Sequence, residues 1–250
     1  MIIRAISGLF FVGLCLASLL YPDWYSYLVF GFFLAITFWE SASFSSRAVG
    51  LFERLSTTIV FSICIVLAFF YWTPKDNAMS FMLLLFLLAV FGNLLGRKNR
   101  PWLLCLYFAI PFFLLMVELR DLYEQKQVFM LFILIWGFDV FSYLGGRFFG
   151  ETKPFPTLSP NKSLEGYAIG LVCLLGCTYL LEQPFWCTLI VAVLGSAGDL
   201  YISFLKRRVG LKDSGKIMPG HGGLIDRFDS FTLTYLAYFL IKYASTYYTY

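Results

Sequence analysis

Long apolar runs restrict what this chain can fold into. Nine such runs, each of 17–21 residues, follow one another and are separated by charges or helix breakers. A helix needs about 20 mainly apolar residues to cross a bilayer, with a range of about 17–25. The runs are 5–21, 24–40, 55–73, 78–96, 102–118, 128–144, 166–182, 185–205 and 230–248. They predict an all-α polytopic membrane protein with about nine transmembrane helices.

The composition supports this prediction. Hydrophobic residues make up 60% of the 250 residues and charged residues only 14%, against about 45–50% and about 25% in soluble domains. Aromatic residues contribute 20%, which suits many helix ends at membrane interfaces, where amphipathic rings collect. Since no polar stretch is long enough to form a soluble domain, we expect residues 1–250 to form a single membrane domain.

The distribution of Lys and Arg predicts the orientation of the chain. With these nine runs as spans, 15 of the 19 Lys and Arg residues fall on the side of the N-terminus. The other four are Lys75, Arg120, Lys126 and Lys242. Loops on the cytoplasmic side of a membrane carry an excess of Lys and Arg. The N-terminus is therefore predicted to be cytoplasmic, with an odd number of spans and the C-terminus on the opposite side.

Two connections on the predicted cytoplasmic side differ from the others. They run from Gly145 to Gly166 and from Lys206 to Asp229, and both are rich in Gly, Pro, Lys and Arg. Each also adjoins a helix with a carboxylate near its end, and a carboxylate at the edge of a bilayer is costly unless it pairs or binds something. We therefore expect residues 128–250 to form a catalytic half and residues 1–127 a scaffold of helices.

The second connection has the features of a metal and phosphate site. Asp199, Ser203 and Lys206 share one helical face by their spacing. The glycines of 220–223 allow a sharp turn that presents N–H groups to an anion. Asp226 begins the next helix, so Asp199 and Asp226 are predicted to converge on a hard cation; Mg²⁺ prefers few protein oxygens, with phosphates completing its shell. The alternative is an internal ion pair between Asp199 and a nearby lysine.

The first connection repeats this pattern in a weaker form. Asp139 precedes Gly145 and Gly146, which are predicted to end their helix. The cations that follow are Arg147, Lys153 and Lys162. The alternative is a capped helix with a basic interfacial loop. The spacing of Gly166 and Gly170 favours a close approach of two helices.

These residues form part of a longer pattern. The 27 residues from Ser203 to Asp229 contain SFLKR, KDSG and PGHGGLIDRFD at fixed spacing. This pattern resembles the signature of the phosphatidate cytidylyltransferases, also called CDP-diacylglycerol synthases. Gly198–Asp199–Leu200 and Ser159–Pro160 resemble further markers of that family. The N-terminal half is similar only in being a set of membrane helices.

The resemblance implies that CMP is transferred from CTP to phosphatidate, giving CDP-diacylglycerol and pyrophosphate, with Mg²⁺. Asp199 and Asp226 match the metal-binding aspartates of the family. The residues expected to be catalytic are Asp199, Lys206, Lys212, Asp213, His221, Asp226, Arg227 and Asp229. Those expected to bind substrate are Asp139, Arg147, Ser159, Lys162, Ser203, Arg207, Gly222 and Gly223. His221 has two alternative roles: it protonates or hydrogen-bonds the pyrophosphate, or it is a structural part of the glycine turn.

The expected partners are CTP, phosphatidate and membrane lipids, with no nucleic acid, and a homodimer is left open. We expect the protein in a bacterial cytoplasmic membrane with its active-site loops facing the cytoplasm. Ile202 stands where the family usually has Glu, so a second cation is also left open. The alternatives are a transferase for an isoprenoid or archaeol-type phosphate, a non-catalytic lipid-binding homologue, and an ion transporter using Asp139 and Asp199.

Overall fold

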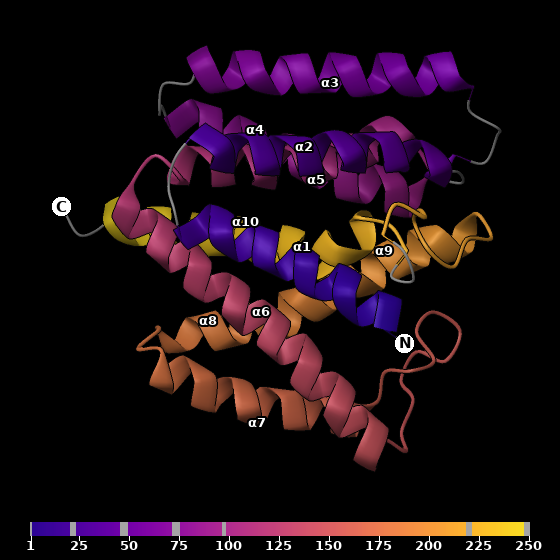
Figure 1. The fold of residues 1–250 in the computed structure, drawn as a ribbon, viewed down its shortest axis with the longest axis vertical. Coiled ribbons are helices and arrows are strands. Elements are labelled where there is room, and N and C mark those ends of the chain that lie inside the picture. The colour runs from indigo at the N-terminus through magenta and orange to yellow at the C-terminus, as the bar shows by residue number, and fades with distance from the viewer. Residues whose placement is uncertain are drawn as a thin grey trace. The chain divides into compact units, whose positions relative to one another are not determined.

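A computed structural model describes residues 2–20, 24–45, 50–71, 76–96, 99–218 and 222–247 of the chain (Figure 1). The helices of the first part are α1 Ile2–Leu20, α2 Trp24–Ser41, the short η1 Ala42–Phe44, α3 Leu51–Tyr71, α4 Asp76–Leu95 and α5 Pro101–Glu118. Those that follow are α6 Leu122–Phe149, α7 Leu164–Leu180, α8 Phe185–Ile190, η2 Val191–Gly195, α9 Ser196–Arg208 and α10 Ile225–Tyr247. Since no β-strand occurs within these ranges, the all-α prediction is confirmed for them.

Each predicted apolar run lies mostly on a helical rod. The run 185–205 corresponds to one rod, in which α8 and α9 are joined by the π-helical turn η2. Among the described residues, four helical segments are long and apolar enough to cross a membrane: Trp24–Phe44, Pro101–Glu118, Glu124–Phe149 and Phe185–Arg208. Large apolar side chains such as Phe52, Leu95 and Tyr179 are more than four-fifths exposed, which suits contact with lipid. The total of nine spans and their orientation stay predictions.

The chain divides into two compact units. The first contains residues 1–125 and 205–227, and the second contains residues 126–204 and 228–250. The division at residue 125 lies close to the predicted boundary of the two halves, but the connection 205–227 groups with the N-terminal helices. The boundaries of the units also fall within α9 and α10.

In the first unit, α5 is the central helix. It contacts α2, α3 and α4, and most of its side chains are buried. The rings of Phe86 on α4 and Tyr107 on α5 stack with their centroids 5.2 Å apart. Arg208 donates hydrogen bonds to the carbonyl groups of Leu94 and Gly96 at the C-terminal end of α4. Because these carbonyls lack partners within the helix, a cation there stabilises the helix end.

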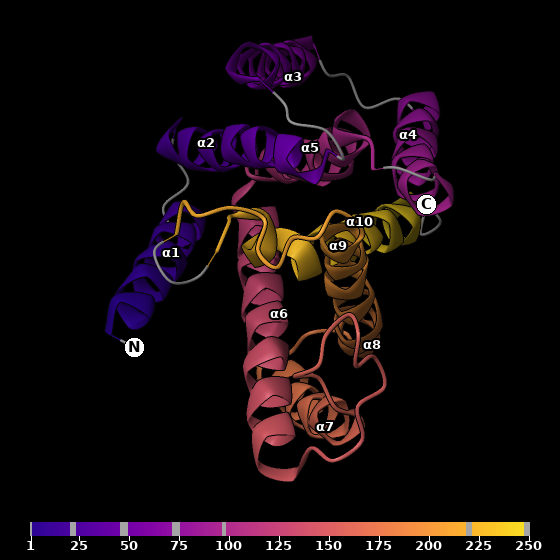
Figure 2. The same ribbon diagram turned by 90° about the vertical axis from the view of Figure 1, so that its right-hand side faces the viewer.

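In the second unit, α6 packs against both α7 and α10. Phe132 on α6 stacks on Phe231 of α10 with centroids 4.7 Å apart. Gly198 on α9 lies so close to α10 that an added Cβ atom would be 2.3 Å from the carbonyl oxygen of Asp229. The small residues before Asp199 therefore allow a close contact between the backbones of α9 and α10. Figure 2 shows the helices of this unit from a second direction.

The prediction that Gly145 and Gly146 end their helix is wrong, because α6 continues to Phe149. A Cβ atom on Gly145 would lie 2.8 Å from Ile169 of α7. One on Gly146 would lie 3.0 Å from the hydroxyl of Ser163. Glycine inside a helix costs about 1 kcal/mol relative to alanine, and the tight packing of α6 on α7 outweighs that cost here.

The close approach predicted from Gly166 and Gly170 is confirmed. We expect Gly166→Ala to lower the free energy of unfolding by about 1–3 kcal/mol, because its Cβ would lie 2.6 Å from the carbonyl oxygen of Ser142. Gly176→Ala on the same helix is the matched control, since a Cβ there meets nothing within 4 Å. Thermal unfolding in detergent measures both variants, and equal melting temperatures would contradict this account of the packing.

Candidate active site

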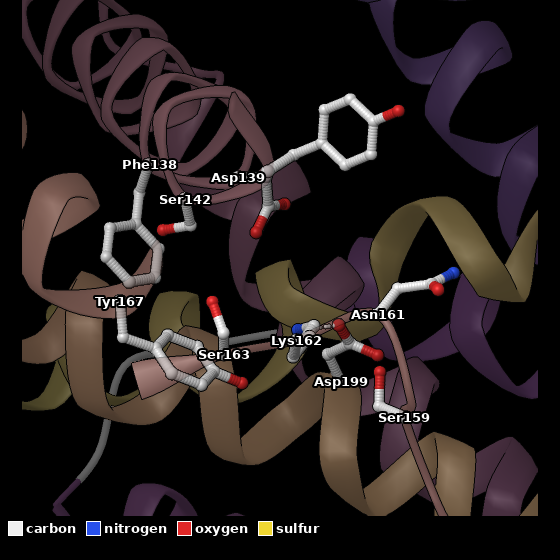
Figure 3. Close-up of a pocket in the computed structure, with 10 residues that line it drawn as sticks. Phe138, Asp139, Ser142, Ser159, Asn161, Lys162, Ser163, Tyr167 and Asp199 are labelled. Carbon is white, nitrogen blue, oxygen red and sulfur yellow. Dashed lines mark ion pairs between the residues drawn. The ribbon is translucent and has the colours of Figure 1, made fainter. Parts of the chain in front are cut away.

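A cavity of about 210 Å³ lies in the second unit, beside the connection from α6 to α7 (Figure 3). Asp139 and Ser142 reach it from α6, and Asp199 reaches it from α9. The residues that line the cavity are Phe138, Asp139, Ser142, Tyr143, Ser159, Asn161, Lys162, Ser163, Tyr167 and Asp199. The structure thus brings together four predicted site residues from three separate segments: Asp139, Ser159, Lys162 and Asp199.

Lys162 and Asp199 form an ion pair at this cavity. The hydroxyl of Ser203, one helical turn after Asp199, donates a hydrogen bond of 3.3 Å to the other carboxylate oxygen. Burial alone would lower the pKa of Lys162, but the Asp199 carboxylate outweighs this effect and holds the pKa above its usual range. Lys162 therefore stays protonated at neutral pH and presents a positive charge to the cavity. The alternative interpretation of Asp199, as the partner of a lysine, is thus the arrangement in the structure.

Local hydrogen bonds hold the segment that carries Lys162. Ser163 caps α7, and its side chain accepts a hydrogen bond from the amide of Gly166, a common way to satisfy a free N–H at a helix start. The carboxylate of Glu165 accepts hydrogen bonds from the amides of Glu151 and Thr152. The connection is therefore fastened at both ends, which fixes the backbone on either side of the cavity-lining residues.

A second cluster of site residues lies in the first unit, around Asp226. One carboxylate oxygen of Asp226 lies 2.7 Å from the ammonium of Lys206. The other accepts hydrogen bonds from the amides of Ser214 and Gly223, at 2.9 and 3.1 Å. The side chains of Asp226 and Lys206 are only 8% and 9% exposed. A charged pair this deeply buried needs such additional hydrogen bonds to offset its lost hydration.

Glu40, on α2, belongs to this cluster although the sequence reasoning missed it. Its carboxylate accepts hydrogen bonds of 3.0 Å from the amides of Leu224 and Ile225 and from the hydroxyl of Ser214. Glu40 is only 2% exposed. A signal was available, because Glu40 lies at the end of the otherwise uncharged run 24–40, and acids in such runs are usually functional.

In the glycine turn, the amide of Gly223 donates to the carboxylate of Asp226. Gly222 has a φ of +85°, a conformation that glycine adopts without strain. A Cβ atom on Gly223 would lie 2.0 Å from the hydroxyl of Ser214 and 2.5 Å from Glu40. Both glycines are therefore required by the local geometry. Phosphate binding by Gly222 and Gly223 stays a prediction, and His221 lies outside the described residues.

The remaining predicted site residues lie at several different places in the structure. Lys212 and Asp213 are exposed and line a second cavity of about 480 Å³ in the first unit, together with Glu40 and Arg54. Arg207 donates a hydrogen bond to the carbonyl of Leu211. The others lie outside the two cavities: Arg147 is exposed on the last turn of α6, and Arg227 and Asp229 are half-buried on the first turns of α10. Ile202 is fully buried.

The carboxylates of Asp199 and Asp226 suit Mg²⁺ in their chemistry, because both are hard oxygen donors held in place by neighbouring hydrogen bonds. The described residues contain no group of three or more potential metal-binding side chains. Mg²⁺ commonly uses only one or two carboxylates, with phosphate oxygens and water as its other ligands. Because Asp199 and Asp226 belong to different units, their convergence on one cation stays a prediction.

Comparison with known proteins identifies the family. The sequence pattern of the cytidylyltransferase family matches residues 2–244. The chain belongs to the cytidylyltransferase family. The match confirms the resemblance seen in Ser203–Asp229, and it extends across the N-terminal helices, where the sequence alone showed no family marker.

Named relatives support this membership of the cytidylyltransferase family. A phosphatidate cytidylyltransferase of Helicobacter pylori (strain J99) is 34% identical over 218 residues, which cover 77% of this chain and 80% of that protein. One of Staphylococcus saprophyticus is 39% identical over 125 residues, and one of Staphylococcus aureus (strain COL) is 44% identical over 110 residues. The chain covers 48% and 42% of the lengths of these two staphylococcal relatives.

Proposed function

We propose that this protein is a phosphatidate cytidylyltransferase, which makes CDP-diacylglycerol and pyrophosphate from CTP and phosphatidate. The observation that carries this proposal is the similarity to the Helicobacter pylori enzyme over four-fifths of that enzyme's length. The pattern from Ser203 to Asp229 and the two clusters of charged residues are consistent with handling of phosphate groups.

The reaction requires little proton transfer. A phosphate monoester is largely dianionic near neutral pH, since its second pKa is about 6, so its oxygen attacks without a strong general base. A bond forms between this oxygen and the α-phosphorus of CTP, while the bond from the α-phosphorus to the oxygen of the leaving pyrophosphate breaks. The protein lowers the barrier by positioning both substrates and by compensating the charge that develops on pyrophosphate.

Residues of both clusters have roles in this proposal. Lys162 contacts phosphate oxygens at the 210 Å³ cavity. Lys212 provides a positive charge at the 480 Å³ cavity. Lys206 compensates the negative charge of the buried Asp226. Asp199 and Asp226 are the residues that would hold Mg²⁺. When bound, this ion would neutralise charge on the phosphate oxygens of the nucleotide.

The proposal also concerns the position of the protein in the cell. We place the N-terminus and the polar connections 145–166 and 206–229 on the cytoplasmic face of a bacterial membrane, because most Lys and Arg residues fall on that side. CTP is available there, while phosphatidate reaches the protein from the bilayer.

Purified protein in detergent, incubated with CTP labelled at its α-phosphate and with Mg²⁺, tests the function. We expect label to enter lipid when phosphatidate is the acceptor, and pyrophosphate to be released in equal amount. Diacylglycerol, which lacks the attacking phosphate, is the matched control and should give no labelled lipid. Labelling of an isoprenoid or archaeol-type phosphate but not of phosphatidate would contradict the proposed acceptor. Folded protein that labels no lipid phosphate would contradict the transferase activity altogether.

A further inference from the structure

Glu40 accepts three hydrogen bonds from one segment of the chain that is distant in the sequence. The donors are the hydroxyl of Ser214 and the amides of Leu224 and Ile225, and all three donor–acceptor distances are 3.0 Å. These donors follow Glu40 by 174 to 185 residues in the sequence. The helix α2 is therefore fastened directly to the connection between α9 and α10.

The amides that Glu40 binds are those that the start of α10 leaves without partners. Ile225 is the first residue of α10, and Leu224 precedes it. The first N–H groups of a helix have no acceptor within the helix, and a buried carboxylate is costly unless it accepts hydrogen bonds. Each group thus meets the requirement of the other, and Glu40 satisfies the free amides at the start of α10.

Two glycines beside Glu40 allow the backbone to lie close to its carboxylate, where a larger residue would not fit. A Cβ atom on Gly215 would lie 2.4 Å from one carboxylate oxygen of Glu40, and one on Gly223 would lie 2.5 Å from the other. The backbone on both sides of the glycine turn therefore packs directly against the carboxylate. Fixing this backbone also fixes the amide of Gly223, which donates to Asp226.

Ser214 connects Glu40 to Asp226. Its hydroxyl oxygen lies 3.0 Å from the carboxylate of Glu40 and 3.1 Å from that of Asp226, so its single proton can be donated to either. Its amide donates to Asp226 at 2.9 Å. A displacement of Glu40 would therefore move Ser214 and Gly223, which are both hydrogen-bond donors to Asp226.

We infer that Glu40 is a positioning residue, which holds Ser214 and the start of α10 so that Asp226 is presented in a fixed orientation. Glu40 contacts no substrate in this inference and acts through these two segments. Its catalytic consequence rests on the proposed function, in which Asp226 binds Mg²⁺. Its structural consequence, the protection of two amides, can be measured without any activity.

The test uses Glu40→Gln in the full-length protein. A glutamine keeps the length and shape of the side chain but places an NH₂ group where one oxygen accepted hydrogen bonds, so an amide of Leu224 or Ile225 faces another donor. We expect faster hydrogen–deuterium exchange at Leu224 and Ile225. We also expect the Mg²⁺ concentration at half-maximal transfer to rise about tenfold, with a smaller change in kcat at saturating Mg²⁺.

Two further variants separate positioning from general destabilisation. Glu118→Gln makes the same change at another buried glutamate of the first unit, and it should leave the Mg²⁺ dependence within about twofold of wild type. Gly215→Ala keeps the Glu40 side chain but displaces its carboxylate, because the added Cβ atom would lie 2.4 Å from one of the carboxylate oxygens. If Glu40→Gln does not fold, Gly215→Ala should show the same faster exchange and the same shift in Mg²⁺ dependence.

The two readouts distinguish failure of this inference from failure of the proposed function. Wild-type exchange at Leu224 and Ile225 in folded Glu40→Gln, or a Mg²⁺ dependence unchanged from wild type, would overturn the positioning role. An equal Mg²⁺ shift in Glu118→Gln would also overturn it. If wild-type protein labels no lipid, the exchange measurement alone decides whether Glu40 holds the start of α10.

Discussion

Asp226→Asn is expected to reduce CTP-dependent transfer to phosphatidate at least about a hundredfold, a loss typical of removing one essential electrostatic group. The physical reason is that an amide is a poor ligand for Mg²⁺ compared with a carboxylate. The substitution also leaves the ammonium of Lys206 without its partner at a site where its side chain is only 9% exposed. Breaking such a buried pair costs about 3–5 kcal/mol, so stability must be measured beside turnover.

A double-mutant cycle separates the two effects. Lys206→Met combined with Asp226→Asn removes the unpaired buried charge, so its melting temperature should recover toward wild type relative to Asp226→Asn alone. Transfer by the double variant should stay at least about a hundredfold reduced, because the carboxylate is still missing. Near-normal turnover in the double variant would show that Asp226 acts only as the partner of Lys206, and it would overturn the metal assignment.

Asp199→Asn is expected to cause a loss of transfer of the same size, at least about a hundredfold, for the same chemical reason. Its effect on stability should be different. The side chains of Lys162 and Asp199 are 25% and 20% exposed, so water can partly compensate for the lost partner, which it cannot do at the more deeply buried pair of Lys206 and Asp226. The variant should therefore insert into the membrane and lose less stability than Asp226→Asn while failing to transfer CMP.

Glu182→Gln serves as the matched control for Asp199→Asn. Glu182 is an exposed acid of the same unit, in the connection between α7 and α8, and its substitution should leave transfer and stability unchanged. Steady-state transfer and thermal unfolding in detergent measure all of these variants. Turnover of Asp199→Asn within a few-fold of the control would remove Asp199 from the proposed metal site.

The positions of the helices could largely be predicted from the sequence, because the described part of each apolar run lies mostly on a helical rod. The exception was local. Gly145 and Gly146 predict a helix end by their intrinsic preferences, yet α6 continues through them because they pack tightly against α7. A partner 24 residues away decides the role of Gly145, and no local rule can take that partner into account.

The charged clusters could be predicted only in part. The sequence pattern predicted Lys162, Asp199 and Asp226 as site residues, and it offered a lysine partner for Asp199 only as an alternative. The structure shows that both aspartates pair with a lysine. Glu40 was not predicted as a site residue because its hydrogen-bond partners lie far along the chain. A buried acid is recognised in a sequence by its rarity in an apolar run, whereas the groups that satisfy it become visible only in the folded structure.

The grouping of residues 205–227 with the N-terminal helices has a consequence for dividing the protein into fragments. A fragment of residues 128–250 would keep the complete Ser203–Asp229 pattern but would lack Glu40, which binds Ser214, and Asn99, whose side chain donates to the carbonyl of Leu205 at 2.8 Å. The separate fragment should therefore leave its glycine turn unformed. Co-expression with residues 1–127 should restore the turn, so the two pieces should behave as a split protein that works only by complementation.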